Sequence, residues 1–221
     1  MGGMNALPTL TGPRFGPQNG DTPDAIVLLL HGLGADGNDL IGLAPLFAEV
    51  APGAIFISPD AHEPCDMAPM GRQWFSLRDF TDQACFEGAA AATPVLDAFI
   101  DGVLAEFGLD ESRLVLSGFS QGCMMSLHVG LRRAKPLAGI LGYSGMVTGP
   151  TVLGGEIASR PPVCLVHGEI DAVVPFASLG MAGAVLGEQG VSVETHARPG
   201  LGHGIDEEGI QIGRAFLKKV L

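Results

Sequence analysis

The feature that most constrains the fold is a series of short, continuous apolar runs that alternate with helical patterns along the chain. The run at 25–30, AIVLLL, contains no polar residue. A run of this kind suits a strand that is buried on both faces of a parallel sheet. Expected strands span residues 25–30, 54–58, 113–117, 137–143, 162–166 and, as an alternating edge strand, 191–196. Expected helices span residues 40–50, 88–107, 121–133, 176–189 and 205–220.

Strands that alternate with helices predict an α/β protein with a mostly parallel central sheet and helices on both faces. The chain has 221 residues, 47% of them hydrophobic, which suits one domain with a sizeable core. We expect a single domain over 1–221, with 1–20 peripheral to it. One irregular stretch, about 60–86, is long enough to be either functional or disordered. Its Trp74, Phe75 and Leu77 argue against disorder.

A candidate nucleophile follows the third expected strand, in the motif Gly118-Phe119-Ser120-Gln121-Gly122. In a G-x-S-x-G motif between a strand and a helix, the serine occupies a cramped turn whose flanking residues must be small. The helix that follows points its free N–H groups toward a developing anion. A chance match is the alternative in a chain with 33 glycines. The strand before the motif and the helix after it favour Ser120 as the nucleophile of an α/β-hydrolase fold.

A serine hydroxyl needs a general base, and in this fold the acid and then the histidine follow the serine along the chain. His128 falls inside the helix expected after the motif, where a packing or surface role is the simpler interpretation. His167 directly follows a strand, and His196 ends the expected edge strand. His203 lies in a glycine-rich loop before the final helix, and such a loop can bring an imidazole to the carboxyl edge of the sheet. We therefore predict that His203 is the base.

The acid is expected in the loop after the strand at 162–166. Asp171 lies in that loop, where a carboxylate can hold the histidine in one tautomer and stabilise its imidazolium form. Glu169 is the local competitor, and capping of the next helix is the alternative role for Asp171. We predict that Asp171 is the acid of the triad.

The segment His31-Gly32-Leu33-Gly34 follows the first strong strand and offers an oxyanion-hole donor. In this fold one donor comes from that loop and the other is the N–H of the residue after the nucleophile. The two predicted donors are therefore the backbone N–H groups of Leu33 and Gln121. A simple turn is the alternative, and His31 is expected to brace the loop without transferring a proton.

Charge and cysteine usage argue against several classes of function. The formal net charge is −12 and no basic stripe occurs, which argues against nucleic acid as a partner and against charge-driven binding to anionic membranes. No apolar stretch is expected to reach the ~18 residues of a membrane span, and the first 20 residues contain no signal-type apolar run. We therefore expect a cytoplasmic protein without stable membrane insertion. The four cysteines form no CxxC pair, and zinc-type spacing is absent, so we expect no metal.

Taken together, these motifs resemble the phospholipase/carboxylesterase family of small serine esterases, which includes the acyl-protein thioesterases. The similarity extends from about residue 25 to residue 221. It rests on His31-Gly32-Leu33-Gly34, Arg72-Gln73-Trp74-Phe75, Gly118-Phe119-Ser120-Gln121-Gly122, Tyr143-Ser144-Gly145, His167-Gly168 with Asp171 to Pro175, and Gly202-His203.

The resemblance implies an α/β-hydrolase fold without a large cap domain, and hydrolysis without cofactor or metal. It implies a small-molecule acyl ester or thioester of short to medium chain length as substrate. It also implies that the segment at 60–86 covers or lines the acyl site, with acyl contacts from Leu33, Trp74 and Val174. Members of the family often carry aspartate where this chain has Ser76, so the preference within the family stays open.

Three alternatives remain at this point. A small lipase or lysophospholipase on the same fold would need a larger apolar mouth, and an acyl-protein thioesterase would use the same residues on a thioester. A non-catalytic binding protein that kept the fold is the third, and the complete set of Ser120, Asp171 and His203 argues against it. The sequence leaves both a monomer and a homodimer open.

Overall fold

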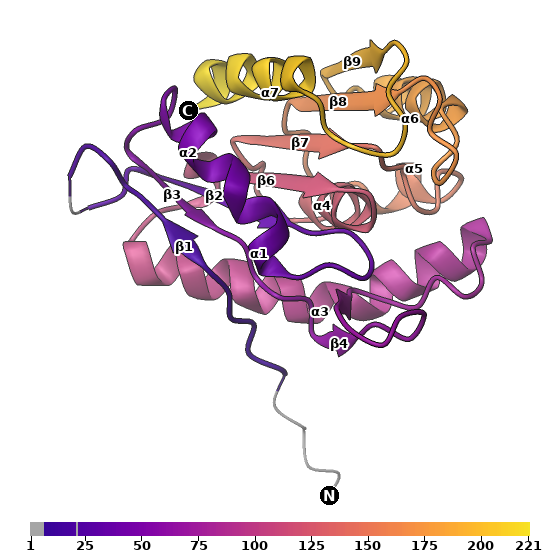
Figure 1. Ribbon diagram of the computed structural model, residues 1–221, viewed down its shortest axis with the longest axis horizontal. Helices are drawn as coiled ribbons and strands as arrows, with labels where there is room; N and C mark the ends of the chain where they lie inside the picture. The colour runs from indigo at the N-terminus through magenta and orange to yellow at the C-terminus, as the bar shows by residue number, and fades with distance from the viewer. Residues whose placement is uncertain (1–6, 21) are drawn as a thin grey trace, which may run out of the picture.

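The computed structural model describes residues 7–20 and 22–221. Its main sheet has seven strands in the order β1-β3-β2-β6-β7-β8-β9 (Figure 1). The strands are β1 (Arg14–Phe15), β2 (Ala25–Leu30), β3 (Ala54–Ile57), β6 (Leu114–Phe119), β7 (Gly139–Tyr143), β8 (Val163–Gly168) and β9 (Val193–Arg198). Every neighbouring pair is parallel except β1 with β3. The predicted mostly parallel sheet and its edge strand near 191–196 are confirmed.

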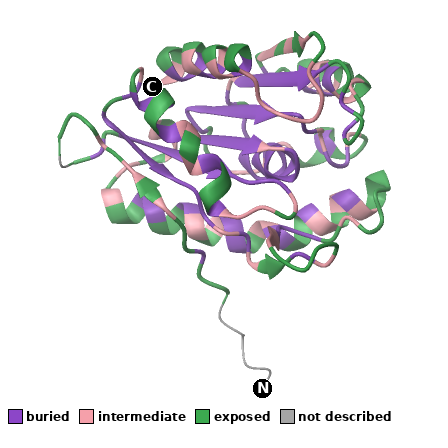
Figure 2. Cartoon of the chain, in the orientation of Figure 1, coloured by how far each residue is buried: buried purple, intermediate pink, exposed green. Residues whose placement is uncertain are grey.

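Helices cover both faces of this sheet, as predicted. They are α1 (Gly37–Leu40), α2 (Ala44–Ala48), α3 (Asp82–Phe107), α4 (Gln121–Gly130), α5 (Leu153–Glu156), α6 (Ala177–Glu188) and α7 (Glu207–Val220). One core layer joins alternate residues of β2 to α3, α4 and α6, and the other joins the remaining residues of β2 to α2 and α7. The central strands are therefore almost entirely buried, as is helix α4, whereas α3, α6 and α7 each have an exposed outer face (Figure 2). This double burial explains why the strands have no polar face.

Helix α5 was not predicted, α4 ends three residues before the predicted 133, and two other helical stretches differ more for local reasons. The stretch at 40–50 is divided into α1, a 3₁₀ turn and α2, and a proline stands in the first turn of α2. Helix α3 begins at Asp82 instead of near 88, because the Thr81 side chain accepts a hydrogen bond from the Ala84 N–H and caps the helix. The stretch before residue 88 carries little apolar periodicity, so the pattern marked only the later part of the helix.

Helix α3 also corrects an expectation about membrane-length segments. It is 26 residues long and, by length and composition alone, apolar enough to cross a membrane, whereas the sequence was expected to contain no such stretch. In the fold one face of α3 contributes Leu96, Ile100 and other buried residues to the core layer that it shares with α4. Core helices of globular proteins pass the same test of length and composition.

The N-terminal stretch contributes to the sheet, although residues 1–20 were expected to be peripheral. Strand β1 pairs antiparallel with β3, and Leu10 is buried in the core layer that contains α3. A two-residue strand has no periodic pattern, which is why the sequence did not indicate it. Residues 1–6, which belong to the same expected peripheral stretch, lie outside the described residues.

The irregular segment between β3 and α3 is ordered around a small hairpin of β4 (Glu63–Pro64) and β5 (Arg72–Gln73). The hairpin is tied to the loop after β2, because the Gly34 N–H donates to the Arg72 carbonyl at 2.8 Å and the Arg72 N–H donates to the Ala35 carbonyl at 2.7 Å. Across the described residues, this segment is a loop on the edge of the sheet and contains no inserted cap domain.

Candidate active site

The predicted site residues come from loops at one edge of the sheet. Strands β2, β6, β8 and β9 are parallel, so their carboxyl ends meet at the same edge (Figure 1). The loops that follow them carry Leu33, Ser120, Asp171 and His203 respectively. Ligand sites of open α/β sheets lie at this edge.

Ser120 occupies a strained turn between β6 and α4. Its backbone has φ 54° and ψ −116°, a positive φ that is costly for any residue other than glycine. A Cβ atom on Gly122 would lie 1.8 Å from the carbonyl oxygen of Leu30, and one on Gly118 would lie 2.2 Å from the backbone of Gly122. Close backbone contacts therefore require glycine at both motif positions. The motif thus forms the expected strand–turn–helix structure and is not a chance match in a glycine-rich chain.

A chain of hydrogen bonds joins the three predicted triad residues. The Nε2 atom of His203 lies 3.0 Å from the Ser120 hydroxyl, and its Nδ1 atom lies 2.7 Å from Oδ2 of Asp171. Because an ionised carboxylate only accepts, Nδ1 carries the proton and Nε2 presents a lone pair to the serine. Oδ1 of Asp171 accepts from the N–H groups of Val173 and Val174, each at 2.9 Å. Burial opposes ionisation of Asp171, but the hydrogen bonds from His203 and the two N–H groups prevail and lower its pKa.

The loop that carries His203 lies directly on the end of β8. A Cβ atom on Gly168 would be 2.3 Å from the carbonyl oxygens of both Leu201 and Gly202, so only glycine permits this approach. The Ile170 N–H donates to the Leu201 carbonyl at 3.0 Å and fixes the acid loop against the histidine loop. The local backbone thus brings together two side chains that are far apart in the sequence.

The competing candidates occupy other positions. His128 is buried on α4 next to the Thr148 hydroxyl, at 2.8 Å, and burial lowers its pKa to about 4. His196 lies on the edge strand β9, and Glu169 is exposed to solvent. In the described part of the chain, none of these three side chains forms a hydrogen bond with Ser120 or His203.

The two predicted oxyanion donors belong to the loop after β2 and to the start of α4. Gln121 is the first residue of α4, so its N–H has no acceptor within the helix. The Leu33 N–H donates to no backbone carbonyl within the described residues, whereas the next N–H, that of Gly34, is bound to Arg72. Neither N–H group thus donates to a backbone carbonyl within the described residues.

His31 braces the loop that carries Leu33, as expected. Its Nε2 accepts from the Ala61 N–H at 3.0 Å, so the proton is on Nδ1, which donates to the Gly32 carbonyl at 2.7 Å. Burial lowers the pKa of His31 and favours this neutral form. A neutral imidazole with both nitrogens engaged in backbone bonds supports the loop and has no proton to exchange with a substrate.

A largely apolar cavity of about 320 Å³ lies over the triad. Its lining consists of Gly32, Leu33, Met67, Leu77, Phe80, Phe119, Ser120, Met124, Val173, Val174 and His203. The predicted contacts Leu33 and Val174 are among these residues. A concave apolar pocket with a few convergent polar groups is typical of a site for a small ligand.

Trp74, the third predicted acyl contact, does not line this cavity. Its side chain is 1% exposed, and its indole N–H donates to the carbonyl of His31 at 3.0 Å. The side-chain amide of Gln121 accepts from the Trp74 N–H at 2.9 Å and donates to the Phe75 carbonyl at 2.7 Å. Trp74 is therefore a buried support that links the loop after β2 to the start of α4. Sequence reasoning predicted a role for the backbone of Gln121 only and missed these two side-chain hydrogen bonds, which no motif signals.

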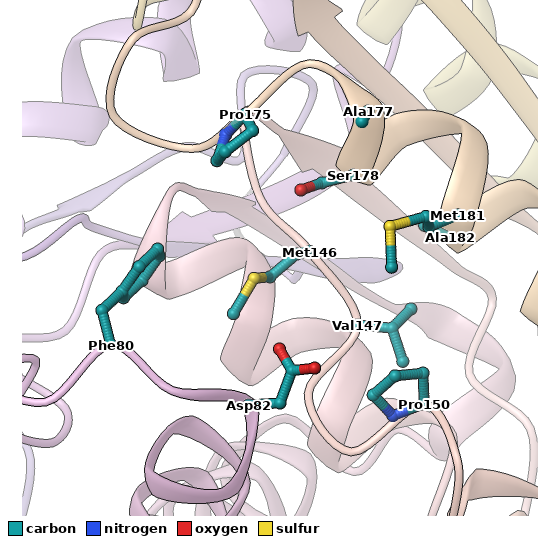
Figure 3. Close-up of a pocket in the computed structure, with 10 residues that line it drawn as sticks. All are labelled: Phe80, Asp82, Met146, Val147, Pro150, Pro175, Ala177, Ser178, Met181 and Ala182. Atoms are coloured by element: carbon teal, nitrogen blue, oxygen red, sulfur yellow. The ribbon is translucent and has the colours of Figure 1, made fainter.

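A second cavity of about 320 Å³ lies beside the first (Figure 3). The two share Phe80, and Pro175 of the second follows Val174 of the first along the chain. Figure 3 shows Met146 and the Asp82 carboxylate next to this space. Its lining residues are Phe80, Asp82, Met146, Val147, Pro150, Pro175, Ala177, Ser178, Met181 and Ala182. Phe80 thus stands between two apolar spaces, of which only the first contains Ser120 and His203.

The triad residues form no cluster that could hold a metal. Among the described side chains, Cys164, Glu194 and His196 do place ligand atoms within 4.8 Å of one another, but they lie on β8 and β9 away from Ser120. Glu194 there already forms an ion pair with Lys219.

Comparisons with known proteins agree with this geometry. A family model described as phospholipase/carboxylesterase matches residues 17–221. Acyl-protein thioesterase 1 of Schizosaccharomyces pombe is 31% identical over 68% of this chain and 70% of its own length. The esterase YpfH of Escherichia coli is 28% identical over 93% of this chain and 87% of its own. The crystal structure of esterase PE8 has a TM-score of 0.92 and 40% identity, and the match covers 96% of this chain and 100% of that one. The predicted α/β-hydrolase fold is confirmed.

Proposed function

This chain belongs to the phospholipase/carboxylesterase family and is a serine hydrolase of the carboxylesterase type, and from that premise we propose its substrates and catalytic residues. It hydrolyses short- to medium-chain carboxylic esters or thioesters. Ser120 is the nucleophile, His203 the general base and Asp171 the acid that orients it. The observation that carries the proposal is the continuous hydrogen-bonded chain from Asp171 through His203 to Ser120 beneath an apolar cavity.

The reaction proceeds in two acyl transfers. Ser120 Oγ attacks the carbonyl carbon while Nε2 of His203 takes the hydroxyl proton, and Asp171 stabilises the imidazolium. The backbone N–H groups of Leu33 and Gln121 bind the oxyanion, each contributing roughly 10²–10³ in rate. The C–O or C–S bond then breaks, and the leaving alcohol or thiol takes the proton from His203. Water repeats the sequence on the acyl-serine, releasing the acid and the free enzyme.

The size of the cavity favours substrates with acyl groups of limited length. The space that contains Ser120 is about 320 Å³, and Phe80 lines both this cavity and the second one. A small lipase or lysophospholipase would require one continuous trough. Thioesters belong in the proposal because one relative bears the name acyl-protein thioesterase and because the triad treats both carbonyls alike.

The remaining parts of the proposal concern the whole protein. We take residues 1–221 as one domain that works in the cytoplasm as a monomer or homodimer, on small-molecule substrates. It uses no cofactor and no metal, binds no nucleic acid and does not insert stably into membranes.

Hydrolysis of p-nitrophenyl esters from acetate to palmitate, and of matched thioesters, tests the proposal. We expect the wild type to cleave the short and medium members and Ser120→Ala to be inactive. Ser178→Ala, which alters a serine of the second cavity, is the matched control and should keep its activity on short esters. Activity in Ser120→Ala would place the nucleophile elsewhere. Rates that rise steadily to emulsified palmitate would favour a lipase.

A further inference from the structure

A second histidine touches the acid of the triad. His167 lies on β8 and is 2% exposed. Its Nε2 atom is 2.9 Å from the carbonyl oxygen of Val174 and 3.3 Å from Oδ2 of Asp171, the same oxygen that accepts from His203. His167 is one of the histidines that follow Ser120 along the chain, but His203 occupies the position of the base.

The surroundings of His167 fix its tautomer. A carbonyl oxygen can only accept a hydrogen bond, so the contact with Val174 places the proton of His167 on Nε2. The same nitrogen lies 3.3 Å from Oδ2 of Asp171, close enough for an electrostatic contact, while its hydrogen bond goes to Val174. The ring of Phe176 packs edge-on against the imidazole and limits its rotation.

The Asp171 carboxylate is consequently surrounded by donors. Oδ1 accepts from the N–H groups of Val173 and Val174, and Oδ2 faces the N–H groups of His203 and His167. Three of these N–H groups form hydrogen bonds and that of His167 makes a 3.3 Å contact, and only one orientation of the carboxylate keeps all four. In that orientation Oδ2 points at Nδ1 of His203.

We propose that His167 is a positioning residue for the acid, which holds the Asp171 carboxylate in the one orientation that serves His203. The proposal rests on the proposed triad and assigns His167 no direct part in the chemistry. The same N–H also holds the Val174 carbonyl, so the acid and one wall of the substrate cavity share a single support. The competing interpretation is a buried histidine that merely stabilises the turn after β8.

Two amide substitutions separate these interpretations. In His167→Gln the side-chain amide nitrogen reaches about as far as Nε2, whereas in His167→Asn it reaches only as far as Nδ1. Both variants place a polar amide in the same buried site, so they form a matched pair. If His167 positions the acid, His167→Asn should lower kcat about 10- to 100-fold with little change in KM, and His167→Gln should restore most of kcat.

The pH profile gives a readout that turn stability alone would not move. Without the His167 N–H beside Oδ2, the ionised Asp171 carboxylate loses one stabilising dipole, so the pKa of Asp171 rises. Protonation of Asp171 then begins at higher pH, which moves the acid limb of kcat/KM to higher pH in His167→Asn. His167→Gln should keep the wild-type limb. Rates are divided by the amount of serine that a fluorophosphonate labels, so that unfolded protein does not lower the measured kcat.

Several results would overturn this inference. It fails if His167→Asn keeps the wild-type kcat and acid limb, or if both variants lose activity equally with an unmoved limb. It also fails if imidazole nitrogen NMR of the wild type finds the proton of His167 on Nδ1, a measurement that needs no variant to fold. Ser120→Ala, measured in parallel, separates failure of the proposed triad from failure of the role of His167. Activity in Ser120→Ala refutes the triad. An inactive Ser120→Ala together with an unchanged His167→Asn refutes only the role of His167.

Discussion

Replacing Gln121 by methionine should loosen the segment that forms one wall of the cavity. Gln121→Met keeps the length of the side chain but removes both amide hydrogen bonds, one from the Trp74 N–H and one to the Phe75 carbonyl. All three residues are buried, so two backbone groups lose their partners. Each costs about 1–3 kcal/mol, or about 2–6 kcal/mol together. That is a large part of a total stability of about 5–15 kcal/mol.

Urea unfolding measures this loss directly. With an m-value of about 2–3 kcal/mol/M, the midpoint of Gln121→Met should fall by roughly 0.7–3 M. Gln83→Met is the matched control, because Gln83 is exposed on α3 and bonds only to Glu87 on the next turn. Its stability should change by no more than about 0.5 kcal/mol. Equal midpoints for the two variants would refute the idea that the Gln121 amide holds the segment in place.

Three further predictions follow from the site and its pockets. Phe80→Ala should join the two cavities and move the optimum of the ester series to longer chains, and an unmoved optimum would contradict a limit set by this ring. Gly122→Ala should abolish activity and soluble expression, since its Cβ would lie 1.8 Å from a carbonyl oxygen of β2. The control Gly180→Ala, with nothing within 4 Å, should be neutral or gain about 0.5–1 kcal/mol in denaturant unfolding. In stopped-flow or steady-state assays, kcat/KM should fall on the acid side as the general base takes up a single proton. Burial opposes ionisation of Asp171, but hydrogen bonds led by that from His203 lower its pKa, so Asp171 stays ionised there, and a two-proton limb would contradict this.

The sequence predicted those parts of the fold that depend on burial and on close backbone approach. Strands β2, β6 and β8 are apolar on both faces because helices cover both sides of the sheet, and this produces the continuous runs seen in the sequence. Strand β1 has only two residues, too few for a periodic signal. The start of α3 depends on a single cap, Thr81, which the apolar pattern does not record.

The candidate site was predictable where chain order and motif determine the geometry. Ser120, Asp171 and His203 each follow a strand that ends at one edge of the sheet, so parallel pairing brings them together. The position of Trp74 was not predictable in this way. Its backbone N–H is bound by the Gln121 amide, 47 residues away along the chain. Contacts between residues so far apart leave no spacing pattern in a single sequence. An amphipathic indole suits either a pocket wall or a buried support, and only the fold decides between them.

The most direct test of the central claim is to label the protein with a fluorophosphonate and to locate the adduct by peptide mass spectrometry. The account predicts one adduct per chain, on Ser120, whose formation abolishes ester hydrolysis in step with labelling and is strongly slowed in His203→Gln. An adduct on another residue, or full ester hydrolysis by a protein whose Ser120 is completely labelled, would contradict it.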